Sequence, residues 1–200
     1  MRWLGVPVVV RPVPVDEAPR PGEDPEAYVR RVALAKARAV EEVPPGWWVL
    51  AADTAVVLDG RILGKPRDPQ EATDMLRALR GRTHTVLTAF ALREPRQDRE
   101  HVRVVATRVV MRSYSDEEIA AYVASGLPLD KAGAYGIQDA PFRPVARLEP
   151  VACFANVVGL PVCHVYRALA AYLPLPRVDI AQRCRMAWGY VCPVPERVEG

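Results

Sequence analysis

T-A-V-V-L-D-G-R-I-L, residues 54–63, is the strongest hairpin signal in this chain. Its central Asp-Gly suits a two-residue turn, in which both residues need positive φ, and apolar segments flank it on both sides. Antiparallel pairing about that turn places Thr54 roughly opposite Gly64. We therefore expect Asp53 and Lys65 to lie side by side at the open end of the hairpin, a carboxylate beside an ammonium group.

Helix starts are marked by capping residues. Asp24 precedes Pro25, and apolar residues then recur at helical spacing as far as the prolines at 44–45. Asp68 opens a second helix over about 68–80, and Ser115 opens a third that runs through Ser125, each with a glutamate three residues after the cap. A final apolar helix is expected over about 162–173.

Apolar runs predict the strands, at 47–52, 83–92, 102–111, 145–148 and 152–158, with a charged loop joining the second and third of these. Residues 6–15 are apolar but rich in proline, which restricts them to an edge strand or an extended lead-in. Strands and helices alternate without a regular βαβ rhythm. The expected fold class is therefore α/β, a mixed β-sheet flanked by helices, with two lobes around a cleft.

The composition favours one globular core. The chain has 200 residues, of which 50% are apolar, and a net charge of +3. Basic residues are scattered among acidic ones, so neither nucleic acid nor a membrane is an expected partner.

The sequence shows no signal core and no run of ~20 apolar residues, so we expect a cytoplasmic protein. Four cysteines lie in the last quarter and are expected to be reduced thiols.

Lysine is rare: of 27 basic residues, 24 are arginine, and the lysines are Lys36, Lys65 and Lys131. Where a general positive charge suffices this chain uses arginine, so each retained lysine indicates a compact ammonium group that holds a phosphate oxygen. Chance placement and a solvent-facing lysine are the alternatives. Asp53 follows a buried run, where it could ligate Mg²⁺ or orient a water molecule, or simply cap a turn.

Five candidate residues supply two carboxylates, two ammonium groups and an amide: Glu17, Asp53, Lys36, Lys65 and Gln138. This set suits metal-assisted attack of water on a phosphoanhydride. Mg²⁺ uses one or two carboxylates plus substrate phosphates, so Glu17 and Asp53 are the candidate metal ligands.

A second candidate segment is D-K-A-G-A-Y-G-I-Q, residues 130–138. Lys131 and Gln138 supply donors there, and the small residues between them allow close backbone approach to a ligand. The sequence has neither the Walker nor the dinucleotide-binding glycine motif. Its three histidines form no cluster and are expected to be structural or solvated.

The order of motifs resembles the Maf family over about residues 3–173. The matching segments are V-D-E (15–17), Y-V-x-R-x-A-L-A-K-A-R-A-V (28–40), A-D-T (52–54), G-K-P-x-D (64–68), M-L-R-x-L-x-G-R-T-H (75–84), D-K-A-G-A-Y-G-I-Q (130–138) and V-V-G-L-P (157–161). The resemblance implies a nucleoside triphosphate pyrophosphatase, also called a septum formation inhibitor, with a divalent cation (Mg²⁺ or Mn²⁺) and a fold similar to that of inosine triphosphatases. A homodimer of this chain is a further candidate partner assembly.

Residue by residue, the resemblance places the proton acceptor on Asp53 and further site positions on Glu17, Lys36, Lys65 and Gln138. Thr54 and Gln138 match positions that the family uses for base selection. The motifs A-D-T and A-G-A-Y-G-I-Q are similar to those of the branch that acts on dTTP and UTP.

Two departures from the family pattern affect these expectations. Family members begin with a strand and an S-x-S-P-R-R loop ahead of the segment that starts here at Leu4-Gly5, so we expect either a start further upstream or reduced activity. The residue after I-Q is Asp139 rather than glycine, and it is expected to crowd or repel a phosphate. A catalytically weakened, nucleotide-binding regulator of cell division is therefore the alternative hypothesis.

The resemblance also predicts a division of the chain. Residues 1–173 form the Maf-like domain, and residues 174–200, with Cys184 and Cys192, form an extension without an assigned role.

Overall fold

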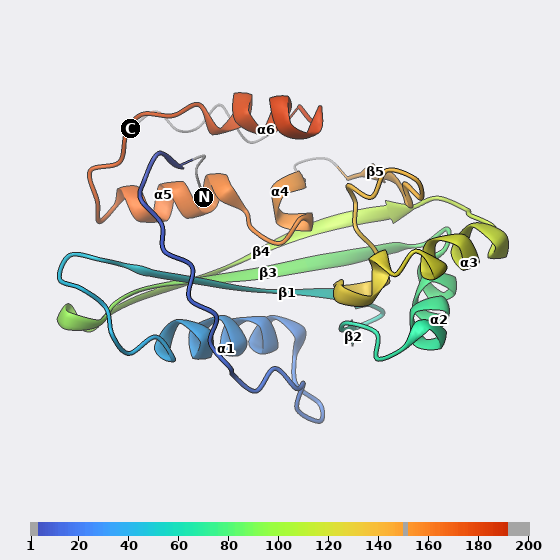
Figure 1. Cartoon of the computed structure of the whole chain (residues 1–200), viewed down its shortest axis with the longest axis horizontal. Coiled ribbons are helices and arrows are strands. Elements are labelled where there is room, and N and C mark those ends of the chain that lie inside the picture. Colours follow the sequence, from blue (N-terminus) through green and yellow to red (C-terminus); the bar gives the residue numbers. More distant parts are fainter. Residues whose placement is uncertain (1–3, 150–151, 192–200) are drawn as a thin grey trace.

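The computed structural model describes residues 4–149 and 152–191 (Figure 1). Its helices and strands follow one another as α1 (Pro25–Arg38), β1 (Val49–Leu58), β2 (Arg61–Leu63), α2 (Pro69–Leu79), β3 (Thr83–Glu94), β4 (Arg99–Met111), α3 (Asp116–Ala124), β5 (Val145–Leu148), α4 (Phe154–Val157), α5 (Val162–Ala170) and α6 (Ile180–Trp188). Short 3-10 helices lie at Pro95–Gln97, Leu127–Asp130 and Ala132–Ala134.

The predicted hairpin is confirmed as β1 and β2. Leu58 lies opposite Arg61 and Val56 opposite Leu63. The turn residues Asp59 and Gly60 have φ values of 50° and 76°, as a two-residue turn of this kind requires. The run at 47–52 is not separate, because β1 is one strand from Val49 to Leu58.

The strands form one sheet in the order β2-β1-β3-β4-β5. The expected α/β class is confirmed, and all four pairings between the described strands are antiparallel. The charged loop between β3 and β4 is shorter than predicted, because the ladder continues to Glu94 opposite Arg99. Opposite charges face each other across this end of the hairpin, with Arg93 opposite Glu100, which favours continued pairing.

The helices are distributed over both faces of the sheet (Figure 1). Helix α1 packs on β1 and β3, where Ala55 and Leu87 point towards it. The opposite face carries Phe90, which packs against α5, and at the β2 end of the sheet the core is completed by α2 and α3. Side chains alternate between faces along a strand, so neighbouring residues of β1 serve opposite faces.

The predicted helix caps are confirmed. Asp24 accepts hydrogen bonds from the backbone N–H groups of Glu26 and Ala27, Asp68 accepts one from Glu71, and Ser115 forms a capping box. Helix α1 ends at Arg38, earlier than the prolines at 44–45 suggested.

Across residues 4–149 and 152–191, no helix combines the length and the apolar character needed to cross a membrane.

The predicted strand at 152–158 is wrong, because this segment holds the one-turn helix α4. Tertiary hydrogen bonds decide its conformation. The side-chain amide of Asn156 donates to Val86 O at 3.2 Å and to Thr107 Oγ1 at 3.0 Å. These bonds fasten the segment above β3 and β4, and they outweigh the strand preference of its valines.

Residues 6–15 form an extended lead-in rather than an edge strand. Val8, Val9 and Val10 are 45%, 60% and 83% exposed. Proline lacks the N–H group that a sheet needs, which explains why this apolar segment does not pair. In Figure 1 it runs from the α5 side of the molecule to the α1 side.

The division of the chain after residue 173 stays a prediction, but the segment beyond it packs on the core. Ile180 and Cys184 of α6 are buried in the same cluster as Leu4 and Leu169. Cys192 lies outside the described residues, as do Met1–Trp3, so the expectations for them are not tested.

Ile180→Ala tests whether α6 is an integral part of the fold. Ile180 is 7% exposed, and its truncation is expected to lower the free energy of unfolding by roughly 2–4 kcal/mol in a urea titration. Met186, on the same helix, is 80% exposed, and Met186→Ala is expected to stay within about 0.5 kcal/mol of the parent. Equal effects of the two changes would show that α6 is not anchored.

Candidate active site

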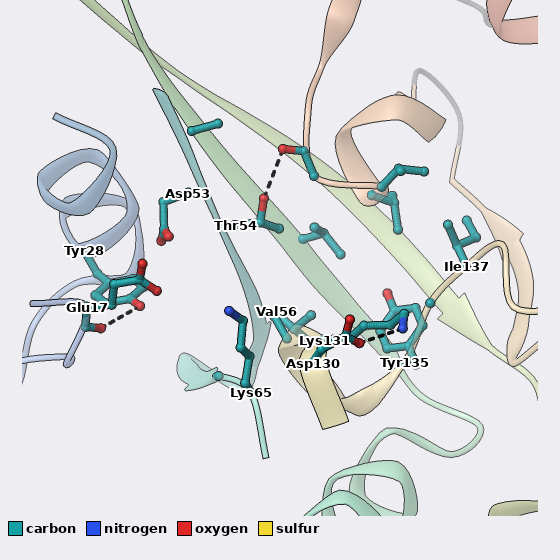
Figure 2. A pocket seen from close by; sticks show the side chains of 18 of the residues that line it. Glu17, Tyr28, Asp53, Thr54, Val56, Lys65, Asp130, Lys131, Tyr135 and Ile137 are labelled. Atoms are coloured by element: carbon teal, nitrogen blue, oxygen red, sulfur yellow. Dashed lines mark hydrogen bonds and ion pairs between the residues drawn. The ribbon is translucent and has the colours of Figure 1, made fainter. Parts of the chain in front are cut away.

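A cavity of about 530 Å³ lies at β1 and is lined from both faces of that strand (Figure 2). All seven residues proposed from the sequence line it: Glu17, Lys36, Asp53, Thr54, Lys65, Lys131 and Gln138. The positions are therefore brought together, whereas the chemical roles given to them stay predictions.

On the α1 face, Lys36 joins two carboxylates. Its ammonium nitrogen lies 2.8 Å from Asp53 Oδ1 and 2.8 Å from Glu17 Oε1. Asp53 faces α1 because it precedes Ala55 by two positions in the strand. Lys36 lies one helical turn after Val32, on the buried stripe of α1. Strand alternation and helical spacing thus place the pair in contact.

Burial controls the protonation of Asp53. Its side chain is 7% exposed, and burial raises the pKa of Asp53 above its usual value, with the negative charge of Glu17 acting in the same direction. The hydrogen bond and charge of Lys36 oppose this rise in the pKa of Asp53 but do not cancel it. Asp53 is therefore a stronger base than an ordinary aspartate.

Lys36 stays charged. Burial alone would lower the pKa of Lys36, but hydrogen bonds to Asp53 and Glu17 outweigh burial and raise it. An ammonium group held between two carboxylates is a fixed positive charge, and it orients Asp53 through Oδ1. The second oxygen, Oδ2, is buried and has no hydrogen-bond partner among the described residues.

The expected neighbour of Asp53 at the hairpin end was Lys65, but its ion-pair partner is Lys36. The hairpin register explains the difference. Pairing of β1 with β2 ends at Val56 opposite Leu63, so the chain leaves the ladder before Lys65. Lys65 is exposed on the cavity wall, and no ion pair joins it to another described residue. The charge of Lys65 still acts on Asp53. Burial is the largest influence on the pKa of Asp53 and raises it, whereas Lys65 lowers it by less.

The other face of β1 gives the cavity an apolar wall. Thr54 points there, beside the segment that follows α4 (Figure 2). The surrounding apolar lining residues are Val56, Val86, Ile137, Val157 and Val158. The cavity thus has a charged part on the α1 face and an apolar part on the α4 face, an arrangement that fits a phosphate chain joined to a flat, weakly polar ring.

Lys131 lines the cavity but is already engaged. Its ammonium nitrogen donates to Leu127 O at 2.5 Å and to Asp130 Oδ1 at 2.7 Å, and Asp139 Oδ2 lies 3.7 Å away. An ammonium group has three donors, so a phosphate would have to share or replace these partners. Gln138 is exposed on the same wall.

Asp139 was expected to crowd or repel a phosphate, but it is not among the residues that line the cavity, and whether its charge repels a phosphate stays a prediction. Its side chain is 10% exposed, and its Oδ2 accepts a hydrogen bond from Tyr122 at 2.5 Å. It lies against Gly136, where an added Cβ would come within 2.7 Å of the carboxylate. Gly133 also has a packing role, since an added Cβ would lie 2.9 Å from the Val56 side chain; the close approach of this segment to a ligand stays a prediction.

Tyr28 and Tyr135 line the cavity and were missed by sequence reasoning. Tyr28 occupies the apolar stripe of α1, and its hydroxyl donates to Glu17 O at 2.9 Å. Burial, with the nearby charges of Asp53 and Glu17, raises the pKa of Tyr28 to about 12. Tyr28 was counted only in the apolar pattern of its helix and Tyr135 only as a member of segment 130–138, and their polar ends were the signal that could have identified them.

His84 supports Tyr135 from the core. His84 Nε2 lies 2.7 Å from Tyr135 Oη. Burial lowers the pKa of His84 to about 4, so the ring is neutral, in agreement with a structural role.

A divalent cation fits this donor set. Asp53 Oδ2 is a buried carboxylate oxygen without a partner among the described residues, and Glu17 lies on the other side of Lys36. Within the described ranges, no group of three or more His, Cys, Asp or Glu side chains could hold a metal ion. Mg²⁺ commonly takes one or two protein carboxylates and completes its shell with water and substrate phosphates. Glu17 and Asp53 supply carboxylates of this kind and stay the predicted ligands, although Lys36 holds both of them in the structure.

Comparison with known proteins shows the family of this chain. The family model described as Maf-like protein matches residues 1–172. A protein of Thermomicrobium roseum named dTTP/UTP pyrophosphatase is 46% identical over 192 residues, covering 92% of this chain and 86% of the relative. Proteins of the same name from Anaeromyxobacter dehalogenans and Myxococcus xanthus are 49% and 48% identical, each covering 86% of this chain and 88% and 86% of the relative. This chain belongs to the Maf family.

Proposed function

We propose that this protein hydrolyses dTTP and UTP to the nucleoside monophosphate and pyrophosphate. The observation that carries the proposal is the cavity at β1, in which a buried base, three lysines and an apolar wall meet. The names of the Maf relatives support the same reaction. Location in the cytoplasm and the presence or absence of a homodimer stay predictions.

In the proposed reaction, Asp53 accepts a proton from a water molecule as that water attacks the α-phosphorus. The bond between this phosphorus and the oxygen that bridges to the β-phosphorus breaks, and pyrophosphate leaves with the bonding electrons. Lys36 holds Asp53 through Oδ1, at 2.8 Å, and stays charged throughout. A divalent cation at Glu17 and Asp53, when bound, would neutralise phosphate charge.

Lys65 is assigned to the phosphate chain because its ammonium group is exposed on the charged part of the cavity. Lys131 and Gln138 are proposed to bind substrate from the opposite wall, and Thr54 is proposed to contact the base. The alternative, a nucleotide-binding regulator without turnover, is not favoured by the relatives' names.

The direct test is pyrophosphate release from dTTP, UTP, CTP, GTP and ATP with Mg²⁺ or Mn²⁺. Turnover of dTTP or UTP supports the proposal. Nucleotide binding without turnover of any of the five, measured by calorimetry, would replace it by the regulator hypothesis.

Lys65→Ala is expected to raise KM for dTTP about tenfold, the usual effect of losing a hydrogen bond to a charged group, with a smaller change in kcat. The control is Arg61→Ala, which removes an exposed cation from the same hairpin outside the cavity lining. Steady-state kinetics separate the two variants. Equal KM values would remove Lys65 from the phosphate site.

A further inference from the structure

Behind the cavity lies a row of buried polar side chains that the proposed chemistry does not use. Thr88 and Asn156 are 0% exposed and Thr107 is 2% exposed. Thr88 lies in the middle of β3, where its neighbours Leu87 and Ala89 are apolar. Neither Thr88 nor Asn156 lines the cavity. Buried polar groups are almost always hydrogen-bonded, so each of these side chains is expected to have a defined partner.

The row connects to the cavity through Thr54. Thr88 lies directly opposite Thr54 in the β1–β3 ladder, and their hydroxyl oxygens are 2.9 Å apart. Thr88 Oγ1 lies 3.1 Å from Asn156 O, and Thr54 Oγ1 lies 3.4 Å from Gly159 O. Two hydroxyl groups and two carbonyl oxygens thus form one hydrogen-bonded row. The dashed line at Thr54 in Figure 2 marks the contact with Gly159 O.

The distances decide which hydroxyl group donates its proton to which oxygen, and this assignment defines the proton order of the hydrogen-bonded row. Hydroxyl hydrogen bonds are strongest near ~2.7–2.8 Å and weaken towards 3.5 Å. Each threonine has a single proton to donate. The shorter contacts are satisfied together when Thr88 donates to Asn156 O and Thr54 donates to Thr88. The 3.4 Å contact to Gly159 is then without a proton.

Asn156 keeps this order in place. Both hydrogens of its side-chain amide are used, on Val86 O and on Thr107 Oγ1. The backbone of Asn156 is therefore fixed to two strands, and its carbonyl is held over Thr88. No other described hydrogen bond goes to Gly159 O, which lies in a residue of the cavity wall.

We propose that Thr88 is a specificity-determining residue: by taking the proton of Thr54, it leaves the Gly159 carbonyl free to accept the imide N–H of a uracil-type base. The inference rests on the proposed function and extends it to the base. The valines of the apolar wall would pack on the ring. Uracil and thymine carry an N–H at ring position 3, whereas cytosine carries a bare nitrogen there, which would face the carbonyl oxygen with a lone pair.

The first test changes the ligand. UTP is compared with CTP and with 3-methyluridine triphosphate, in which a methyl group replaces the imide hydrogen. The expected loss of kcat/KM is at least about tenfold for both analogues, because the carbonyl is left unpaired. Equal kcat/KM for UTP and the methylated analogue would overturn the inference, and preference for GTP over UTP would overturn its restriction to pyrimidines.

The second test changes the proton order. Thr88→Val has nearly the same shape but neither donates nor accepts, so Thr54 must donate to Gly159 O instead. The ratio of kcat/KM for UTP over CTP is expected to fall about tenfold. Thr88→Ser keeps the hydroxyl and should restore the ratio. Thr85→Val, on the opposite face of the same strand and outside the cavity lining, should leave it unchanged. An unchanged ratio in folded Thr88→Val contradicts the proposal.

Binding measurements keep this test separate from the proposed reaction. Calorimetric affinities of UMP, CMP and 3-methyluridine monophosphate need no turnover. If no triphosphate is hydrolysed, the proposed function fails, but preference for UMP over both other ligands, lost in Thr88→Val, still supports the base assignment. Equal affinities of the parent protein for all three overturn it.

Discussion

Asp53→Asn is expected to lower kcat for dTTP hydrolysis about 10³-fold, within the range for loss of a general base. Asparagine has nearly the same size, and its amide oxygen can still accept the hydrogen bond from Lys36 that is 2.8 Å long in the parent. What it cannot do is take a proton from water. The change therefore removes the chemical step and keeps the geometry.

The same substitution is expected to leave the melting temperature at pH 7 unchanged or higher. Burial raises the pKa of Asp53 above its usual value near 3.8, so folding favours the protonated form. A group with a raised pKa stabilises the fold at low pH and loses that contribution as the pH rises through the raised pKa. At neutral pH the ionised carboxylate is thus a cost, which asparagine removes.

Two measurements check this expectation: steady-state pyrophosphate release and thermal unfolding, both on Asp53→Asn and on Asp74→Asn. Asp74 is exposed on α2, and its variant should match the parent in both. Turnover of Asp53→Asn within tenfold of the parent would move the base to another residue. A collapse of its melting temperature would show instead that the ionised carboxylate supports the fold.

The sequence predicted this site better than it predicted the contacts inside it. Spacing alone brings Asp53 and Lys36 to facing surfaces, since strand alternation points Asp53 at α1 and helical periodicity points Lys36 at the sheet. Yet the predicted neighbour was Lys65. The choice between the two lysines depends on where pairing of β1 with β2 stops, at Val56, and no local propensity fixes that point.

The same limit explains the error at α4. Residues 152–158 have the composition of a strand, and the amide of Asn156 holds them as a helix through bonds to Val86 and Thr107. These partners lie 70 and 49 positions away in the chain. By contrast, the starts of α1, α2 and α3 were predicted correctly, because a cap and the N–H groups that it satisfies lie within three residues of each other. Capping signals located the helix starts, whereas the apolar run at 152–158 was misleading because the hydrogen bonds that fix it are not visible in the sequence.

Lys36→Met is expected to lower kcat/KM about 10²-fold. It is also expected to move the acid limb of the pH profile of kcat/KM to higher pH. Methionine is also a long, unbranched side chain, but it leaves Glu17 and Asp53 without the ammonium group that lies 2.8 Å from each. Burial and the charge of Glu17 raise the pKa of Asp53, and Lys36 supplies the hydrogen bond and the largest charge that lower it. Without Lys36, the pKa of Asp53 rises further.

The direction of the shift follows from the active form of Asp53. The carboxylate is the base, so activity falls as the pH drops through its pKa, and a higher pKa moves that fall to higher pH. Lys36→Arg keeps a positive charge and is expected to return the acid limb towards the parent position. In the double variant with Asp53→Asn, the loss from Lys36→Met should largely disappear, because Lys36 acts through Asp53. An acid limb that stays in place in Lys36→Met would assign it to another group, and full additivity of the two changes would give Lys36 a role of its own on the phosphate.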